Sequence, residues 1–104
     1  MKQKTKGTNA ERELVHMFWE VGWAAIRVAG SGSSPHPSPD VLAGNAVRRV
    51  AIECKSIKDK QVYLGKDEVQ QLQYFAGLFG AEPWVGVRFG KGKWFFLTPE
   101  DLHM

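Results

Sequence analysis

Three charged residues in one short stretch of the sequence have types that suit chemistry on a phosphodiester. The stretch PDVLAGNAVRRVAIECKS runs from Pro39 to Ser56 and contains Asp40, Glu53 and Lys55. Two carboxylates that lie close together repel each other unless a cation or a proton intervenes. Carboxylates, water and phosphate oxygens are also the ligands that Mg²⁺ prefers. The pattern therefore indicates metal-assisted phosphodiester hydrolysis, with Lys55 as a compact positive charge beside the scissile phosphate.

A β-hairpin would bring these residues together. Gly44-Asn45 is a turn signal, which predicts paired strands over 40–44 and 47–56. Strand alternation then puts Glu53 and Lys55 on one face, with their Cα atoms about 7 Å apart. The short turn allows Asp40 to approach Glu53, although the sequence does not determine the register of the two strands.

A second interpretation explains the same residues without chemistry. Glu and Lys often alternate on the solvated face of a strand, and Pro-Asp is a common turn sequence. The formal net charge of +3 and the pI of about 9.2 fit an anionic partner, but they also fit an ordinary soluble protein. On the pattern alone, a nuclease site and a solvated hairpin both stay open.

The rest of the chain predicts the elements around this hairpin. A helix is expected to start at Thr8, because Thr8 and Glu11 fit the capping-box pattern, and to end at Gly22. The remaining expected segments are a basic mobile arm (1–7), a strand (23–28), a flexible Gly/Ser/Pro-rich loop (29–39), a helix (66–79), two strands (83–89 and 93–97) and a helix start at Thr98-Pro99. The order α-β-β-β-α-β-β predicts an α/β protein: a single domain over 1–104 with a mixed β-sheet flanked by helices.

Composition excludes several other classes. The length of 104 residues suits one domain, and the single cysteine, Cys54, excludes an intrachain disulfide and argues against a Cys-based zinc site. No apolar run approaches the roughly 20 residues of a membrane span, and no apolar signal core follows the basic N-terminus. We therefore expect a cytoplasmic protein with no membrane partner.

At these residues the chain resembles the archaeal Holliday junction resolvases, a family of the restriction-endonuclease-like nuclease superfamily. The likeness lies in five segments, GTNAEREL (7–14), RVAGSG (27–32), PDV (39–41), IECKS (52–56) and YLGK (63–66). The P-D and E-x-K residues are shared across the superfamily, whereas the N-terminal and glycine-serine segments point to the resolvases. Cys54 is a mild departure, because most members carry an apolar residue there, and a buried cysteine behaves as a small hydrophobe.

The resemblance implies a restriction-endonuclease-like fold and an endodeoxyribonuclease that depends on Mg²⁺, with Mn²⁺ as a possible substitute. It implies that Glu11, Asp40 and Glu53 hold the metal, together with the backbone carbonyl of Cys54, and that Lys55 is the catalytic lysine. Ser31 matches a loop serine that approaches the cleaved phosphate.

The resemblance also implies the partners, which are a four-way DNA junction, nicked on two opposing strands, and a second copy of the chain in a homodimer. Arg12 and Arg27 match residues expected to contact DNA. Further basic residues that could bind phosphates are Lys4, Lys6, Lys58 and Lys66, although a solvated surface explains them equally well. Trp84, Trp94, Phe95 and Phe96 crowd the last two strands, and either a partner interface or a well-filled core accounts for them.

Overall fold

The structure, a computed structural model, describes residues 2–30, 33–57 and 64–102. Its elements are α1 (Lys2–Glu20), β1 (Ala24–Arg27), β2 (Val41–Gly44), β3 (Arg49–Ile57), α2 (Lys66–Phe79), β4 (Glu82–Phe89), β5 (Lys93–Leu97) and the 3₁₀ helix η2 (Pro99–Asp101). The predicted α/β class and the order α-β-β-β-α-β-β are confirmed.

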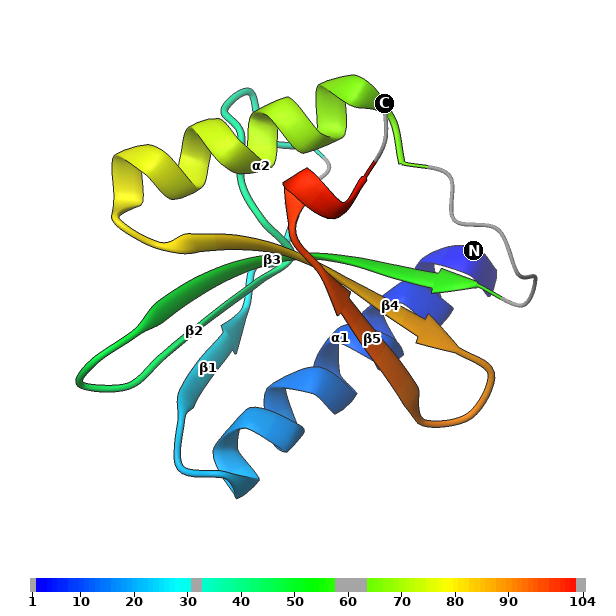
Figure 1. Cartoon of the computed structure of the whole chain (residues 1–104). Helices are drawn as coiled ribbons and strands as arrows, with labels where there is room; N and C mark the ends of the chain where they lie inside the picture. The colour runs from blue at the N-terminus through cyan, green and yellow to red at the C-terminus, as the bar shows by residue number, and fades with distance from the viewer. Residues whose placement is uncertain (1, 31–32, 58–63, 103–104) are drawn as a thin grey trace.

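The strands form one mixed sheet in the order β1-β2-β3-β4-β5. Strands β1, β2 and β3 are joined by antiparallel pairing, as are β4 and β5, whereas β3 and β4 are parallel. A parallel pair needs a long crossover, and α2 supplies it because it lies between β3 and β4 in the chain. Figure 1 shows the twisted sheet between the two helices.

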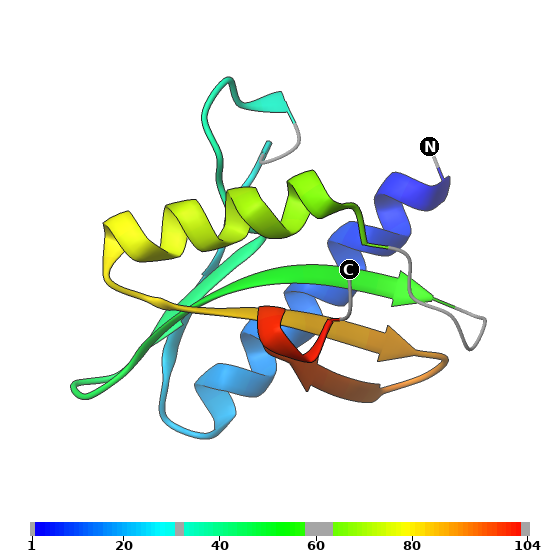
Figure 2. The ribbon, with the colours of Figure 1, turned by 45° about the horizontal axis from the view of Figure 1, so that its top comes forward.

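Strand β3 separates two hydrophobic cores. Its residues Val50 and Ile52 pack in one cluster with Leu14 of α1. Ala51, on the opposite face, packs with Leu72 of α2. Figure 2 shows α1 and α2 crossing opposite faces of the sheet. By alternation, the later residues of β3 that share the face of Ala51 point toward the α2 side.

The N-terminal helix begins earlier than the sequence predicts. Helix α1 starts at Lys2, so Thr8 lies inside it and the expected cap at Thr8 is wrong. The backbone of residues 2–7 continues the helix instead of forming a separate arm, because Lys and Gln favour helix and an existing helix extends at little cost. Although α1 is 19 residues long, none of the helices described is long and apolar enough to cross a bilayer.

The helix ends agree with the sequence. Gly22 follows α1 with φ +88°, and Gly80 ends α2 in the left-handed conformation with its N–H donating to the Ala76 carbonyl. Only glycine adopts this conformation without strain, which is why both helices end at these residues.

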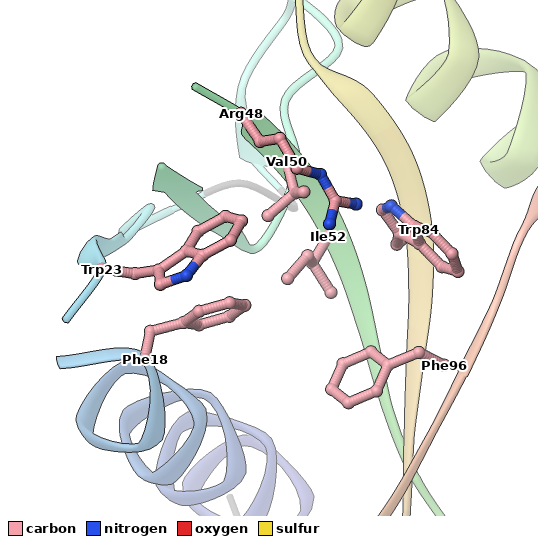
Figure 3. A pocket seen from close by; sticks show the side chains of 7 residues that line it. All are labelled: Phe18, Trp23, Arg48, Val50, Ile52, Trp84 and Phe96. Atoms are coloured by element: carbon pink, nitrogen blue, oxygen red, sulfur yellow. The ribbon is translucent and has the colours of Figure 1, made fainter. Parts of the chain in front are cut away.

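A hollow of about 240 Å³ on the α1 side gathers aromatic side chains around the sheet; its lining is Phe18, Trp23, Arg48, Val50, Ile52, Trp84 and Phe96. In Figure 3 the aromatic rings surround Ile52, and the Arg48 guanidinium points across the opening. That guanidinium lies 5.8 Å from the centroid of the Trp23 ring and bonds both carboxylate oxygens of Glu82, at 2.8 and 2.7 Å. The hollow is therefore a half-buried extension of the α1-side core.

The aromatic residues of the last two strands are divided between the faces of the sheet. Trp84 and Trp94 pack against the α1-side core, and the Trp94 ring stacks on Phe96 with centroids 6.0 Å apart. Phe95 instead contacts Phe89, at 5.3 Å between centroids, and Phe89 packs on the α2-side core. Phe95 and Phe96 are 55 and 40% exposed, so the strands are not wholly absorbed into the core, and a partner interface at these residues stays a prediction.

Candidate active site

Asp40 is held in place by the strands on both sides of it. Its N–H donates to the Ile52 carbonyl at 2.9 Å, and its carbonyl accepts from the Val28 N–H at 2.8 Å. Its side chain is almost fully buried, and Oδ2 accepts the backbone N–H of Cys54 at 2.8 Å. Backbone and side chain are thus both tied to β3, so the position of this carboxylate is closely determined.

Asp40 and Glu53 lie close together where the chain enters β2. The β2–β3 ladder pairs Val41 with Ile52, and Asp40, the residue before β2, donates its N–H to the carbonyl of the same Ile52. The Asp40 carboxylate reaches Glu53 closely enough to act on it both through its charge and through a side-chain hydrogen bond. The sequence left the approach of these two residues open, and the structure has their carboxylates close together.

The pKa of Glu53 reflects both its burial and the nearby Asp40 carboxylate. Burial, followed by the negative charge of Asp40, raises the pKa of Glu53 from 4.5 to about 8, although the Lys55 ammonium acts in the opposite direction. A carboxyl group with so high a pKa is one whose charge lacks compensation. Strongly shifted carboxyl groups are frequent at catalytic and metal sites.

Glu11 approaches the same place from α1. Burial, and then the charge of Asp40, raises its pKa, while the hydrogen bond and charge of Arg27 lower it. Arg27 Nη1 lies 3.4 Å from Glu11 Oε1. Burial also raises the pKa of the Cys54 thiol, helped by the charges of Asp40, Glu11 and Glu53. Cys54 on β3 is therefore close enough to all three carboxylates that the sequence singled out for their charges to act on its thiol.

The carboxylates of Glu11, Asp40 and Glu53 suit a hard divalent cation. Their side chains do not converge into a complete set of metal ligands in this structure. Within residues 2–30, 33–57 and 64–102, no group of three or more His, Cys, Asp or Glu side chains converges closely enough to hold a metal ion. Glu11 is instead turned toward Arg27 at 3.4 Å. The neighbouring carboxylates Asp40 and Glu53 are the oxygen donors that Mg²⁺ prefers, and their mutual repulsion is what a bound cation would relieve.

Lys55 contacts a residue that the sequence analysis missed. Its Nζ donates to Glu68 Oε1 at 2.8 Å, and Glu68 lies in the first turn of α2. Glu68 Oε2 accepts the N–H of Gly65 at 2.8 Å, as in a capping box. A glutamate three residues after Gly65, the residue before the expected helix, was the available signal, but it indicates a cap rather than a partner for Lys55.

The other predicted site residues fall into two groups. Arg12 on α1 and Lys66 at the start of α2 are exposed. Ser31 and Lys58 lie outside the described residues, as do the side chains of Lys4 and Lys6. The roles expected for these six residues, and for the carbonyl of Cys54, stay predictions.

Comparison with known proteins identifies the family of the chain. The family described as "Archaeal holliday junction resolvase (hjc)" matches residues 2–104. The chain is 52% identical over 99 residues to crossover junction endodeoxyribonuclease Hjc of Archaeoglobus fulgidus, covering 95% of this chain and 73% of that protein. It is 36% identical over 97 residues to crossover junction endodeoxyribonuclease Hje of Saccharolobus solfataricus, covering 90% and 72%.

A solved structure gives the same result for the fold. Archaeoglobus fulgidus Hjc, described as a Holliday junction resolvase from an archaeal hyperthermophile, matches with a TM-score of 0.85 and 48% identity. The match covers 88% of this chain and 75% of that one. On both sequence and structure, the chain belongs to the archaeal Holliday junction resolvase family.

Proposed function

We propose that this chain resolves four-way DNA junctions by cutting phosphodiester bonds. It is a crossover junction endodeoxyribonuclease, a function supported by membership of the family and by two relatives with that name. The single observation that carries the proposal is the close approach of the Asp40 and Glu53 carboxylates, with Lys55 two residues farther along β3 than Glu53. A solvated hairpin would not bury Asp40 or raise the pKa of Glu53 so far.

We propose Mg²⁺ as the cofactor, with Mn²⁺ as a substitute. Asp40 and Glu53 would hold it, with Glu11 and the Cys54 carbonyl as further ligands. When bound, the metal lowers the pKa of a water molecule and neutralises charge on the phosphate. Lys55 holds its ammonium where charge develops on the phosphate during hydrolysis.

We propose that DNA is recognised through its backbone and shape. Arg27 lies at the carboxylate site, where it bonds Glu11, and a guanidinium suits bidentate contact with phosphate. Arg12 and Lys66 are exposed cations on the two helices. Ser31, Lys4, Lys6 and Lys58 complete the proposed phosphate contacts. Such contacts position a protein on DNA without reading base sequence.

A homodimer is the proposed assembly, and its interface is the exposed apolar side of α2. Tyr74, Leu78 and Phe79 are 62, 74 and 52% exposed. They line a groove of about 400 Å³ together with Phe75 and the loop residues His36 and Pro37. The aromatic hollow on the α1 side suits this role less well, because its walls are half-buried and Arg48 lies across it. A two-fold dimer matches a junction in which two strands are cut symmetrically.

Replacing Leu78 by arginine is expected to convert the dimer to a monomer. A charge on each copy would meet its like across a two-fold interface, and burying either one is costly. Light scattering after size exclusion measures the mass. Val47→Arg is the matched control, because Val47 is 82% exposed at the β2–β3 turn and does not line this groove. A Leu78→Arg protein that stays dimeric would exclude this interface.

The proposed function is tested by cleavage of a panel of labelled substrates. Linear duplex, flap and four-way junction are each incubated with the protein, with Mg²⁺ or with EDTA. We expect paired nicks in the junction alone, only with Mg²⁺. Preferred cleavage of the duplex or flap would instead identify another nuclease of the superfamily. No nicking of any DNA would leave a non-catalytic DNA-binding module.

A further inference from the structure

Glu68 joins the lysine of the site to the N-terminus of α2. One carboxylate oxygen, Oε1, accepts from Lys55 Nζ at 2.8 Å. The other oxygen, Oε2, accepts from the backbone N–H of Gly65 at 2.8 Å. The carboxylate is therefore held at the start of the helix while it holds the ammonium.

Only a carboxylate can fill both positions at this length. Glutamine has one acceptor oxygen, and its NH₂ group would face either the Lys55 ammonium or the Gly65 N–H, both of which are donors. Aspartate keeps two acceptors but lacks one methylene group. The two hydrogen bonds thus use both oxygens and the full length of Glu68.

Stability does not account for this pair. The side chains of Lys55 and Glu68 are 27 and 41% exposed, and ion pairs exposed to this extent add little to stability. A lysine has a flexible four-carbon stem, whose freedom must be restricted before its charge can act at one place. Residues that fix the rotamer of a catalytic group serve preorganisation.

The geometry points to Glu68 as the positioning residue for Lys55, and this inference rests on the proposed nuclease function. Glu68 holds the ammonium beside Glu53 before DNA arrives. Glu68 does not touch the phosphate. It acts through Lys55, and the first turn of α2 is thereby part of the support of the active site.

Single-turnover cleavage of a four-way junction tests this role, with Glu68→Gln and Glu68→Asp compared with wild type. We expect both variants to cleave roughly tenfold more slowly or worse, because a misplaced catalytic group lowers the rate of the chemical step. Junction affinity, measured in Ca²⁺, should stay within about twofold, since affinity depends mainly on phosphate contacts. A purely structural role would not separate rate from affinity in this way.

Glu82→Gln is the matched control, because it also removes a glutamate paired with a cation, Arg48, at 2.7 Å. Its cleavage rate should equal that of wild type. Thermal unfolding identifies which variants are folded at the assay temperature. If either folded Glu68 variant cleaves as fast as wild type, or faster, Glu68 does not position Lys55. If wild type itself cuts no junction, the proposed function fails instead.

Discussion

Glu53→Gln is expected to lower the rate of junction cleavage by on the order of 1000-fold while leaving junction affinity within a few-fold of wild type. The substitution keeps the shape of the side chain but removes one of the two adjacent carboxylates. A neutral amide is a poor ligand for Mg²⁺, so the variant would hold less well the cation that neutralises negative charge on the phosphate. Binding survives because phosphate contacts from basic residues supply most of the affinity. Single-turnover cleavage in Mg²⁺ and binding in Ca²⁺ measure the two effects separately.

Asp40→Asn should give the same pattern, because Asp40 is the other member of the pair. Glu82→Gln again serves as the control, since Glu82 lies at the start of β4 and bonds Arg48. Its cleavage should match that of wild type. Normal cleavage by either Glu53→Gln or Asp40→Asn in Mg²⁺ would show that the carboxylate pair is not the catalytic centre.

Glu53→Gln is also expected to stabilise the metal-free protein at pH 8. Burial first, then Asp40, raise the pKa of Glu53 from 4.5 to about 8. Between these values the folded protein keeps a proton that the unfolded chain releases, so the free energy of unfolding falls as pH rises. We expect this loss to reach about 2–4 kcal/mol by pH 8 after allowance for partial exposure. The glutamine side chain stays neutral at every pH in this range, so the variant does not lose this free energy of unfolding.

Thermal unfolding in EDTA from pH 5 to pH 8 measures this effect. At pH 8, Tm of Glu53→Gln should exceed that of wild type by roughly 10 °C, and the difference should shrink toward pH 5. Added Mg²⁺ should raise Tm of wild type far more than that of the variant, because a ligand stabilises the state that binds it. Glu82→Gln should follow the pH dependence of wild type across this range. A parallel pH dependence in Glu53→Gln and wild type would contradict the raised pKa.

Local patterns predicted most of the elements. The helix Lys66–Phe79 and the strand Lys93–Leu97 have the bounds that periodicity indicates, and both faces of β3 follow simple alternation. Helix and strand bounds depend on residues that are close together in the sequence, so their periodic pattern can be recognised without a structure. The start of α1 was placed six residues too late, because a good capping box at Thr8 outweighed the weaker helix preference of the residues before it.

For the candidate active site, the sequence indicated which residues to consider but not how they are arranged. The approach of Asp40 to Glu53 depends on how the chain enters β2, where Asp40 and Val41 both face Ile52, and no local pattern in the sequence shows this. Glu68 was missed because its link to Lys55 crosses from α2 to β3. A contact between residues of different elements leaves no local pattern in the sequence, whereas a helix cap does.

The backbone hydrogen bonds of Asp40 allow the loop before it to accept insertions. Asp40 is bonded to Val28 on one side and to Ile52 on the other, at 2.8 and 2.9 Å. Both ends of the segment between Val28 and Asp40 are therefore clamped by the sheet, and lengthening a surface loop costs little free energy. Insertions or labels at the exposed residues Ser34 and Pro35 of this segment can be accommodated without displacing the carboxylate. An inserted residue at this place would therefore leave the backbone position of Asp40 unchanged.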